Sequence, residues 1–266
     1  MFAEERKELI KKKIYSEGTV YVKELAKEFR VSTPTIRHDL DEIVSIYKDL
    51  ERTHGGAIYK KKKKENQEKF IIYKERATLN KSLKKEIGRN AISLIGEKDT
   101  LLLDSSSTTF ELASLLATSK LKNTVLTNGL TTAMVLKQNP NLTVIVIRGI
   151  VKVDSNTIHD EFQDPILDQF NIDKYFFSAS GLSIESGFSE FNISEVKSKK
   201  ENIQRVKTKI ALIDSSKFDK DSSSTFCSLE DVDMVISDSS LNKEIMEKYR
   251  KKVPLIISQN ENNFLL

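Results

Sequence analysis

A run of hydroxyl side chains in this chain stands where an anion could bind. The short apolar segment Thr100–Leu103 is followed by a helical pattern that starts near Thr109. Backbone N–H groups at a helix start are unpaired and the helix dipole is positive there, so hydroxyls beside them can help to hold a phosphate. Plain capping of the helix is the alternative role. The residues are Asp104, Ser105, Ser106, Ser107, Thr108 and Thr109.

Polar residues also follow four other apolar segments. If these segments are parallel strands, their carboxyl ends meet at one edge of the sheet, which is where ligands bind in open α/β folds. Several polar groups on one rim favour a polyhydroxylated, anionic ligand, for which Lys217 would supply a positive charge; a functionless surface lysine is the alternative. The polar clusters are Thr127-Asn128-Gly129, Arg148-Gly149, Asp214-Ser-Ser-Lys217 and Ser237-Asp238.

Two amphipathic segments near the N-terminus are spaced as in a helix-turn-helix. A helix over Arg6–Ser16, with Leu9, Ile10 and Ile14 inward, is predicted to precede them and to end at Gly18. Within Val22–Phe29 the apolar residues share one face. In the next segment Ser32 is a good N-cap and Pro34 falls in the first turn, where its missing N–H costs little. The inward residues of this second helix are Ile36, Leu40 and Ile43.

The outward side chains of that second helix suit contact with DNA. Threonine and arginine can reach both phosphates and base edges when a helix enters the major groove. Gly55-Gly56 between two short extended segments predicts a wing hairpin. An ordinary amphipathic helical hairpin is the alternative. The candidate DNA contacts are Ser32, Thr33, Thr35, Arg37, His38, Arg52 and His54.

The charge is unevenly divided along the chain. Of the 43 basic and 39 acidic residues, residues 1–64 hold 16 and 11, a net charge of +5, and the remainder has a net charge of −1. Contact with a phosphate backbone requires such a local excess. The lysine run at 60–64 weakens the argument, because such runs are often solvated linkers.

The composition of the chain argues against a membrane span, a signal peptide, an internal disulfide and a metal site. No run of 18 apolar residues exists, so we expect no membrane span, and the charged N-terminus lacks a signal-peptide pattern. A single cysteine, Cys227, fits a reducing cytoplasm, and the scattered histidines suggest no metal site. We predict a DNA-binding module over 1–60, a linker over 61–75 and a larger domain over 76–266.

The larger domain alternates helical and strand patterns, which predicts an α/β fold with a mostly parallel sheet covered on both faces. Helices are expected over 83–95, 109–116, 130–137, near 160–169, 194–206 and 242–250. Strands are expected over 100–103, 124–127, 142–147, 174–177, 209–213, 234–236 and 255–257.

The N-terminal motifs resemble those of the DeoR family of bacterial repressors. The match rests on Thr35-Ile-Arg-His-Asp-Leu40 followed by Arg52-Thr-His-Gly-Gly-Ala57. The resemblance implies a winged helix-turn-helix. His38 stands where the family usually has a second arginine, and the segment 46–49 lacks the usual glycine-containing turn.

The larger domain resembles the family's effector domain across residues 76–235. The matching residues are those at 104–109, Thr127-Asn128, Ser180-Gly181, Glu195 with Lys199, and Asp214-Ser-Ser-Lys-Phe218. The resemblance implies a fold similar to ribose-5-phosphate isomerase, with the 104–109 loop holding the phosphate of a sugar and Asn128, Glu195 and Lys217 around it. Ser106, Ile150 and His159 stand where the family usually has glycines, which leaves the shape of the pocket open.

We therefore expect a cytoplasmic repressor of a sugar-uptake or sugar-catabolic operon, controlled by a sugar phosphate and needing no cofactor. Operator DNA would be its partner, and the resemblance implies a homo-oligomer. The alternative is an isomerase-like enzyme that uses Asp104, Glu190, Glu195 and Lys217, since proton transfer at a sugar carbon needs a carboxylate beside the substrate. An isomerase would leave the DNA-binding module unexplained, so we expect no enzyme.

Overall fold

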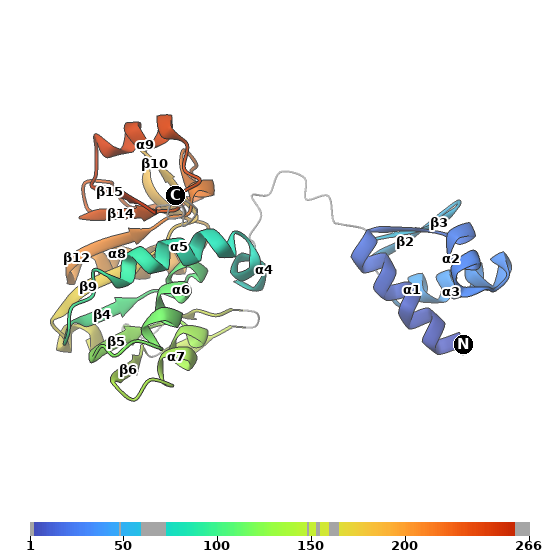
Figure 1. Ribbon diagram of the computed structural model, residues 1–266, viewed down its shortest axis with the longest axis horizontal. Helices are drawn as coiled ribbons and strands as arrows, with labels where there is room; N and C mark the ends of the chain where they lie inside the picture. The colour runs from blue at the N-terminus through green and yellow to red at the C-terminus, as the bar shows by residue number, and fades with distance from the viewer. Residues whose placement is uncertain are drawn as a thin grey trace, which may run out of the picture. The chain divides into compact units, whose positions relative to one another are not determined.

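The computed structural model of the chain describes residues 3–47, 49–59, 73–147, 149–152, 155–159 and 165–258. The contacts divide it into two units, Met1–Lys69 and Phe70–Leu266, which are described separately (Figure 1). Most of the predicted linker, Arg148 and residues 160–164 of one predicted helix lie outside the described residues.

The N-terminal unit is a winged helix-turn-helix, as the sequence predicted. Three helices pack against a small antiparallel sheet with the strand order β1-β3-β2. The elements are α1 (Ala3–Glu17), β1 (Thr19–Tyr21), α2 (Val22–Phe29), α3 (Thr33–Ile46), β2 (Leu50–Thr53) and β3 (Gly56–Tyr59).

Apolar periodicity explains most of this unit's core. Ile10 and Ile14 of α1 and Ile36 and Leu40 of α3 are fully buried, whereas the predicted inward residue Leu9 is 40% exposed. At the wing turn, backbones approach so closely that a Cβ on Gly56 would lie 1.8 Å from the backbone oxygen of Val20. Only glycine fits there without moving the strands.

The C-terminal unit alternates strands and helices, close to the predicted boundaries. Its helices are α4 (Tyr73–Thr78), α5 (Lys81–Ile92), α6 (Ser107–Leu116), α7 (Leu130–Leu136), α8 (Ile193–Gln204) and α9 (Lys243–Arg250), with 3-10 turns η1 (Pro165–Gln169) and η2 (Ser215–Lys217). The strands of its main sheet are β4 (Thr100–Leu103), β5 (Asn123–Thr127), β6 (Leu142–Val146), β9 (Ile172–Phe177), β12 (Val206–Leu212), β14 (Met234–Ser237) and β15 (Leu255–Ile257).

All neighbouring strands of this seven-stranded sheet are parallel, in the order β15-β14-β12-β9-β4-β5-β6. The strand order reverses between β4 and β9, because β5 and β6 continue to one side of β4 and the later strands continue to the other side of β9. A crevice outside the carboxyl ends of two such strands is where ligands bind in this class of fold.

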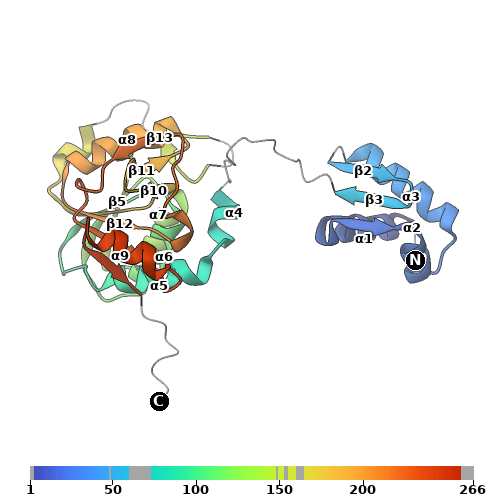
Figure 2. The same ribbon diagram turned by 90° about the horizontal axis from the view of Figure 1, so that it is seen from above.

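Alternation along the strands divides the core between the two faces of the sheet. Leu101 and Leu103 pack with α5, α6 and α7, whereas Leu102 packs on the opposite side with α8 and α9. Figure 2 shows α8 and α5 on opposite sides of this unit. Because both faces are covered, the strands are apolar throughout.

Two small antiparallel sheets were not predicted. Strands β10 (Gly181–Ser183), β11 (Gly187–Glu190) and β13 (Ser224–Cys227) form a second sheet, and β7 (Ile150–Val151) pairs with β8 (Ile158–His159). The second sheet matters for function because Glu190, at the end of β11, reaches the crevice between β4 and β9.

Candidate functional site

The second helix of the helix-turn-helix, α3, begins as the sequence predicted. The hydroxyl of Ser32 caps it by accepting the Thr35 N–H at 3.2 Å, and Pro34 lies in the first turn. Arg37 and His38 are exposed on the outer face, and Thr35 is half-buried with its hydroxyl 2.8 Å from that of Ser32. Thr33 and His54 are also exposed.

Arg52 is half-buried and bonded to the protein rather than extended from it. Its guanidinium Nε donates to Asp41 of α3 at 2.5 Å, and an Nη1 donates to the backbone oxygen of Gly56 in the wing. These bonds tie the wing to α3. Arg52 therefore positions the elements that present the other candidate contacts.

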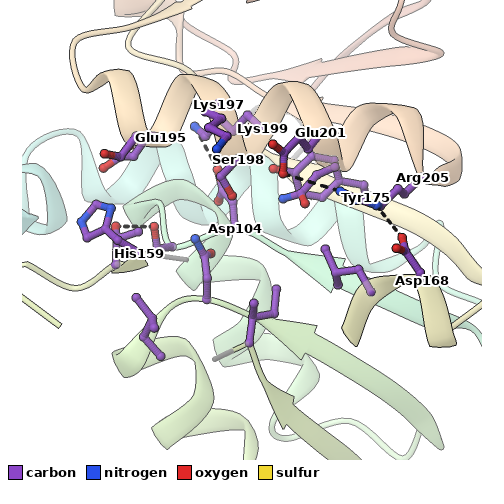
Figure 3. Close-up of a pocket in the computed structure, with 18 residues that line it drawn as sticks. Asp104, His159, Asp168, Tyr175, Glu195, Lys197, Ser198, Lys199, Glu201 and Arg205 are labelled. Atoms are coloured by element: carbon purple, nitrogen blue, oxygen red, sulfur yellow. Dashed lines mark hydrogen bonds and ion pairs between the residues drawn. The ribbon is translucent and has the colours of Figure 1, made fainter. Parts of the chain in front are cut away.

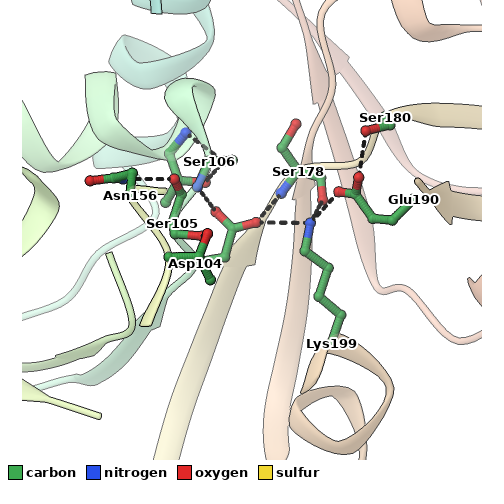
Figure 4. Close-up of polar contacts among 10 residues, drawn as sticks. Asp104, Ser105, Ser106, Asn156, Ser178, Ser180, Glu190 and Lys199 are labelled. Atoms are coloured by element: carbon green, nitrogen blue, oxygen red, sulfur yellow. Dashed lines mark hydrogen bonds and ion pairs between the residues drawn. The ribbon is translucent and has the colours of Figure 1, made fainter. Parts of the chain in front are cut away.

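In the C-terminal unit, a buried polar network spans the crevice between β4 and β9 (Figure 4). Asp104, at the end of β4, accepts hydrogen bonds from the backbone N–H of Ser106 at 3.0 Å and of Ser178 at 2.9 Å. The Lys199 ammonium lies 3.2 Å from Asp104 and 2.5 Å from Glu190. Ser180 donates to the other oxygen of Glu190.

Electrostatics keeps this network charged. Burial alone would raise the pKa of Asp104, but Lys199 and the hydrogen bonds from Ser106 and Ser178 outweigh burial and lower it. Burial opposes the charge on Lys199, yet Glu190 and Asp104 raise its pKa well above the ordinary range. A carboxylate held in this way accepts protons poorly near neutral pH, which argues against Asp104 as a general base.

A small hollow of about 30 Å³ lies at the N-terminus of α6. Neither Ser107 nor Thr108 has a partner for its backbone N–H among the described residues. Arg76 and Lys217 line the same hollow; within the described ranges neither side chain forms an ion pair, and the buried Nε of Arg76 makes no hydrogen bond. The hollow therefore concentrates unsatisfied positive groups.

Lys84 completes this hollow from α5. Its ammonium donates to the backbone oxygens of Arg76 and Leu79 at 2.5 and 2.8 Å and to the Ser107 hydroxyl at 3.1 Å. Burial, together with the charges of Lys217 and Arg76, outweighs the attraction of Asp214 and lowers the pKa of Lys84 to about 8. An anion placed there would favour its protonated form.

A second, larger cavity of about 390 Å³ lies beside α8 (Figure 3). Asp104, Ser105, Asn128 and Glu195 line it, and it shares no lining residue with the small hollow. Burial, and then the charge of nearby Glu190, raises the pKa of Glu195. Asp104, Lys199 and Glu190 stand between the two spaces, since the first two line the cavity and Glu190 lines the hollow.

Two sequence models of one protein family match this chain. The sequence model described as the DeoR C terminal sensor domain matches residues 79–239, and that of the DeoR-like helix-turn-helix domain matches residues 6–63. The chain belongs to the DeoR family. It is a DNA-binding transcriptional regulator of that family, with its helix-turn-helix at the N-terminus and its sensor domain behind it.

Similar DeoR-family regulators align over nearly their whole length. The HTH-type transcriptional regulator GolR of Listeria innocua serovar 6a is 34% identical over 251 residues, covering 94% of this chain and 96% of that protein. The L-fucose operon activator of Haemophilus influenzae is 30% identical over 92% and 95%. The lactose phosphotransferase system repressor of Staphylococcus epidermidis is 29% identical over 92% and 96%.

Solved structures that are similar to this regulator include ribose 5-phosphate isomerases, the fold that the resemblance implied for its sensor domain. Ribose 5-phosphate isomerase A of Methanocaldococcus jannaschii is 14% identical, with a TM-score of 0.40, and the match covers 52% of this chain and 55% of that one. The β subunit of eIF2B from Chaetomium thermophilum has a TM-score of 0.42, with 58% and 48% covered. At such TM-scores, and over about half of each chain, the likeness carries no argument about activity.

The sensor-domain residues selected from the sequence do not form one pocket. Four of them line the small hollow: Ser106, Ser107, Thr108 and Lys217. Four others line the large cavity: Asp104, Ser105, Asn128 and Glu195. Thr109 is fully buried and lines neither. Ser106 caps α6 by accepting the Thr109 N–H at 3.2 Å, so its hydroxyl has the capping role that the sequence left open.

Sequence reasoning missed Arg76 and Lys84. Both belong to the segment 73–92, which looked like a linker end and an ordinary amphipathic helix. One signal was available, because Lys84 lies three residues before Ile87 on the buried side of α5. A buried lysine requires acceptors or a counter-ion.

Two positions at which the resemblance led us to expect glycine are neighbours. Ile150 of β7 pairs directly with His159 of β8. Ile150 is partly exposed, whereas His159 is buried and lines the large cavity. The imidazole of His159 therefore borders the large cavity, and a glycine at this position would leave the cavity wider.

Among the described residues, no helix has the length and apolar character needed to cross a membrane. The described ranges also hold no group of three or more histidine, cysteine, aspartate or glutamate side chains arranged to bind a metal ion.

Proposed function

We propose that this DeoR-family regulator represses a sugar-uptake or sugar-catabolic operon in the cytoplasm, and that a sugar phosphate bound in the small hollow controls it. The observation that carries this proposal is the convergence of Arg76, Lys84 and Lys217 on the two unpaired N–H groups at the start of α6. Helix N-termini with added cations are the usual protein site for phosphate.

Charge supports the choice of the small hollow over the large cavity. The described residues of the hollow include three cations and two carboxylates, one of which, Glu190, is already paired with Lys199. The present volume of about 30 Å³ holds little more than water, so phosphate binding requires the side chains of Arg76 and Lys217 to move outward. Neither side chain is held by an ion pair in the described structure, so the movement costs little free energy.

The position of Arg76 suggests how the ligand signal reaches the DNA-binding module. Arg76 lies on α4, the first helix of the sensor domain in chain order, and α4 also contacts α7 through a 2.9 Å hydrogen bond between Tyr73 and Thr131. A phosphate that draws the Arg76 side chain toward it would shift α4, on which Arg76 lies. The ligand changes DNA affinity only by its different affinity for the two arrangements.

We further propose that the functional form is a homo-oligomer that presents two or more helix-turn-helix modules to repeated operator sites. Linked modules gain affinity by effective concentration, so that each needs only modest affinity of its own. Candidate contacts to the DNA are Ser32, Thr33, Thr35, Arg37, His38 and His54, with Arg52 holding the wing against α3.

Isomerase activity is not part of the proposal. Two of its candidate bases, Asp104 and Glu190, are paired with Lys199. The proteins that align with this chain over nearly their whole length are named as a transcriptional regulator and a repressor. Incubation with pentose and hexose phosphates is expected to leave every substrate unchanged by NMR. Turnover that is lost in Glu190→Gln would instead establish the enzymatic alternative.

The decisive experiment measures operator binding by fluorescence anisotropy while sugar phosphates are added. We expect at least one sugar phosphate to change the affinity of the parent, and both Arg76→Ala and Lys217→Ala to abolish that response while retaining DNA binding. Lys243→Ala, an exposed lysine at the start of α9, is the matched control. A response that persists unchanged in both hollow variants would exclude the small hollow as the effector site.

A further inference from the structure

The large cavity beside α8 is a separate space that the phosphate site leaves unexplained. Its volume of about 390 Å³ is within the range of small-molecule sites. It shares no lining residue with the small hollow: Asp104 and Lys199 line the cavity (Figure 3), and their buried partner Glu190 lines the hollow (Figure 4 shows the three together). The residues proposed to hold the phosphate therefore do not account for this cavity.

The charges around the cavity disfavour an anion. Its described lining contains four carboxylates and three cations. Two of the cations are already paired: Lys199 with Asp104 and Glu190, and Arg205 with Asp168 at 2.7 Å. The third, Lys197, is exposed to solvent. A phosphate here would meet a net negative lining with no buried cation left to receive it.

The neutral groups of the cavity fit a sugar without phosphate. The Tyr175 hydroxyl is fully buried and makes no hydrogen bond of normal geometry in the described structure, although Asn202 lies near it. The half-buried side-chain amide of Asn128 also has no partner among the described residues. Ile147, Ile158 and Leu167 supply apolar walls. Hydrogen-bonding groups set in an apolar wall match the hydroxyls and C–H faces of a sugar ring.

We propose that the large cavity binds an uncharged polyhydroxylated molecule, a monosaccharide or a sugar alcohol, as a second ligand of the sensor domain. Asn128 and Tyr175 recognise its hydroxyl groups, and the walls beside Ile147 and Leu167 contact its carbon skeleton. The chain then responds to a sugar and to a sugar phosphate at two different places.

Calorimetric titration of the full chain with D-glucose, D-galactose, L-fucose and D-glucitol tests this proposal. At least one is expected to bind the parent saturably at millimolar concentration. Asn128→Ala and Tyr175→Phe should each weaken that binding about three- to tenfold, the effect of losing one neutral hydrogen bond. Lys217→Ala, the matched control, should bind the neutral probe as the parent does.

Three results would overturn the proposal: no neutral probe binds the parent, both cavity variants bind as tightly as the parent, or Lys217→Ala loses the neutral probe. A parallel titration with sulfate keeps the two proposals distinguishable. Sulfate binding that depends on Lys217 but not on Asn128 supports the phosphate site whatever the neutral probes do. Sulfate binding that depends on Asn128 instead would place the anion in the large cavity and contradict both assignments.

Discussion

Arg6 of α1 reaches Asp39 of α3 inside the helix-turn-helix core: the Arg6 Nε lies 2.6 Å from Asp39 Oδ2, and an Nη2 lies 3.1 Å from Oδ1. Both residues are buried. This two-pronged ion pair fixes the orientation of the helix that presents Arg37 and His38. Asp39 is thus a buried charged residue directly after the outward-facing Arg37 and His38.

Asp39→Ala is expected to destabilise the N-terminal unit by about 3–5 kcal/mol, because it leaves the Arg6 guanidinium buried without its partner. Urea unfolding of the full chain should show an early transition for this unit, with operator binding lost alongside. The double variant Arg6→Met with Asp39→Leu should recover much of the stability. Unchanged stability in the single variant would mean that water replaces the carboxylate.

Arg37→Ala should weaken operator binding by about 1–3 kcal/mol without changing stability, since the side chain is exposed and forms no hydrogen bond or ion pair with the other described residues. A DNA-binding titration at fixed salt checks this. Lys23→Ala, an exposed lysine on α2, should lose less. Equal affinities for Arg37→Ala and the parent would reject α3 as the groove-entering helix.

Anion binding in the small hollow should depend on pH through Lys84. Its pKa is lowered to about 8, so the ammonium is increasingly deprotonated above that pH and loses its attraction for a bound anion. Sulfate keeps its charge over this range, and its affinity should fall as pH rises from 7 to 9. Lys84→Met should bind sulfate weakly at every pH.

Lys217→Ala is the control for that titration. It should weaken sulfate binding but preserve the fall in affinity near pH 8, because Lys84 remains. If the parent binds sulfate equally at pH 7 and pH 9, Lys84 does not act as the titrating group.

Lys199→Met should destabilise the sensor domain by about 3–5 kcal/mol at neutral pH, because Asp104 and Glu190 would remain buried without a cation. The pKa of Asp104 is lowered in the parent, so its contribution to stability is present above the unfolded value and lost as pH falls through the folded value. In the variant, protonation of Asp104 removes its unpaired buried charge, and the stability gap should narrow on acidification.

Thermal unfolding from pH 7 to pH 4 measures this gap. Lys200→Met, an exposed neighbour on α8, should unfold like the parent throughout. A constant difference between Lys199→Met and the parent at all pH values would show that packing, rather than charge, is the cause.

Local patterns in the sequence were enough to predict most elements and the class of each unit. The Ser32 cap, Pro34 in the first turn and the spacing of Ile36 and Leu40 act within a few residues of one another, so they define α3 without any tertiary information. The same holds for the strand at Thr100–Leu103, whose apolar side chains on both faces mark it as interior. The sequence did not predict the short strands β10, β11 and β13, because their pairing joins segments up to about 40 residues apart.

The sequence by itself therefore determined the winged helix-turn-helix, the parallel sheet and the placement of polar residues at its carboxyl edge. Only the tertiary structure decided that these polar residues divide between two spaces, because consecutive residues after a strand can face different spaces, as Ser105 and Ser106 do. Long-range packing also decided that Lys84 and Arg76 join Lys217, and that Lys199 pairs with Asp104. These partners lie on separate elements, so their spacing along the chain does not predict that they come into contact.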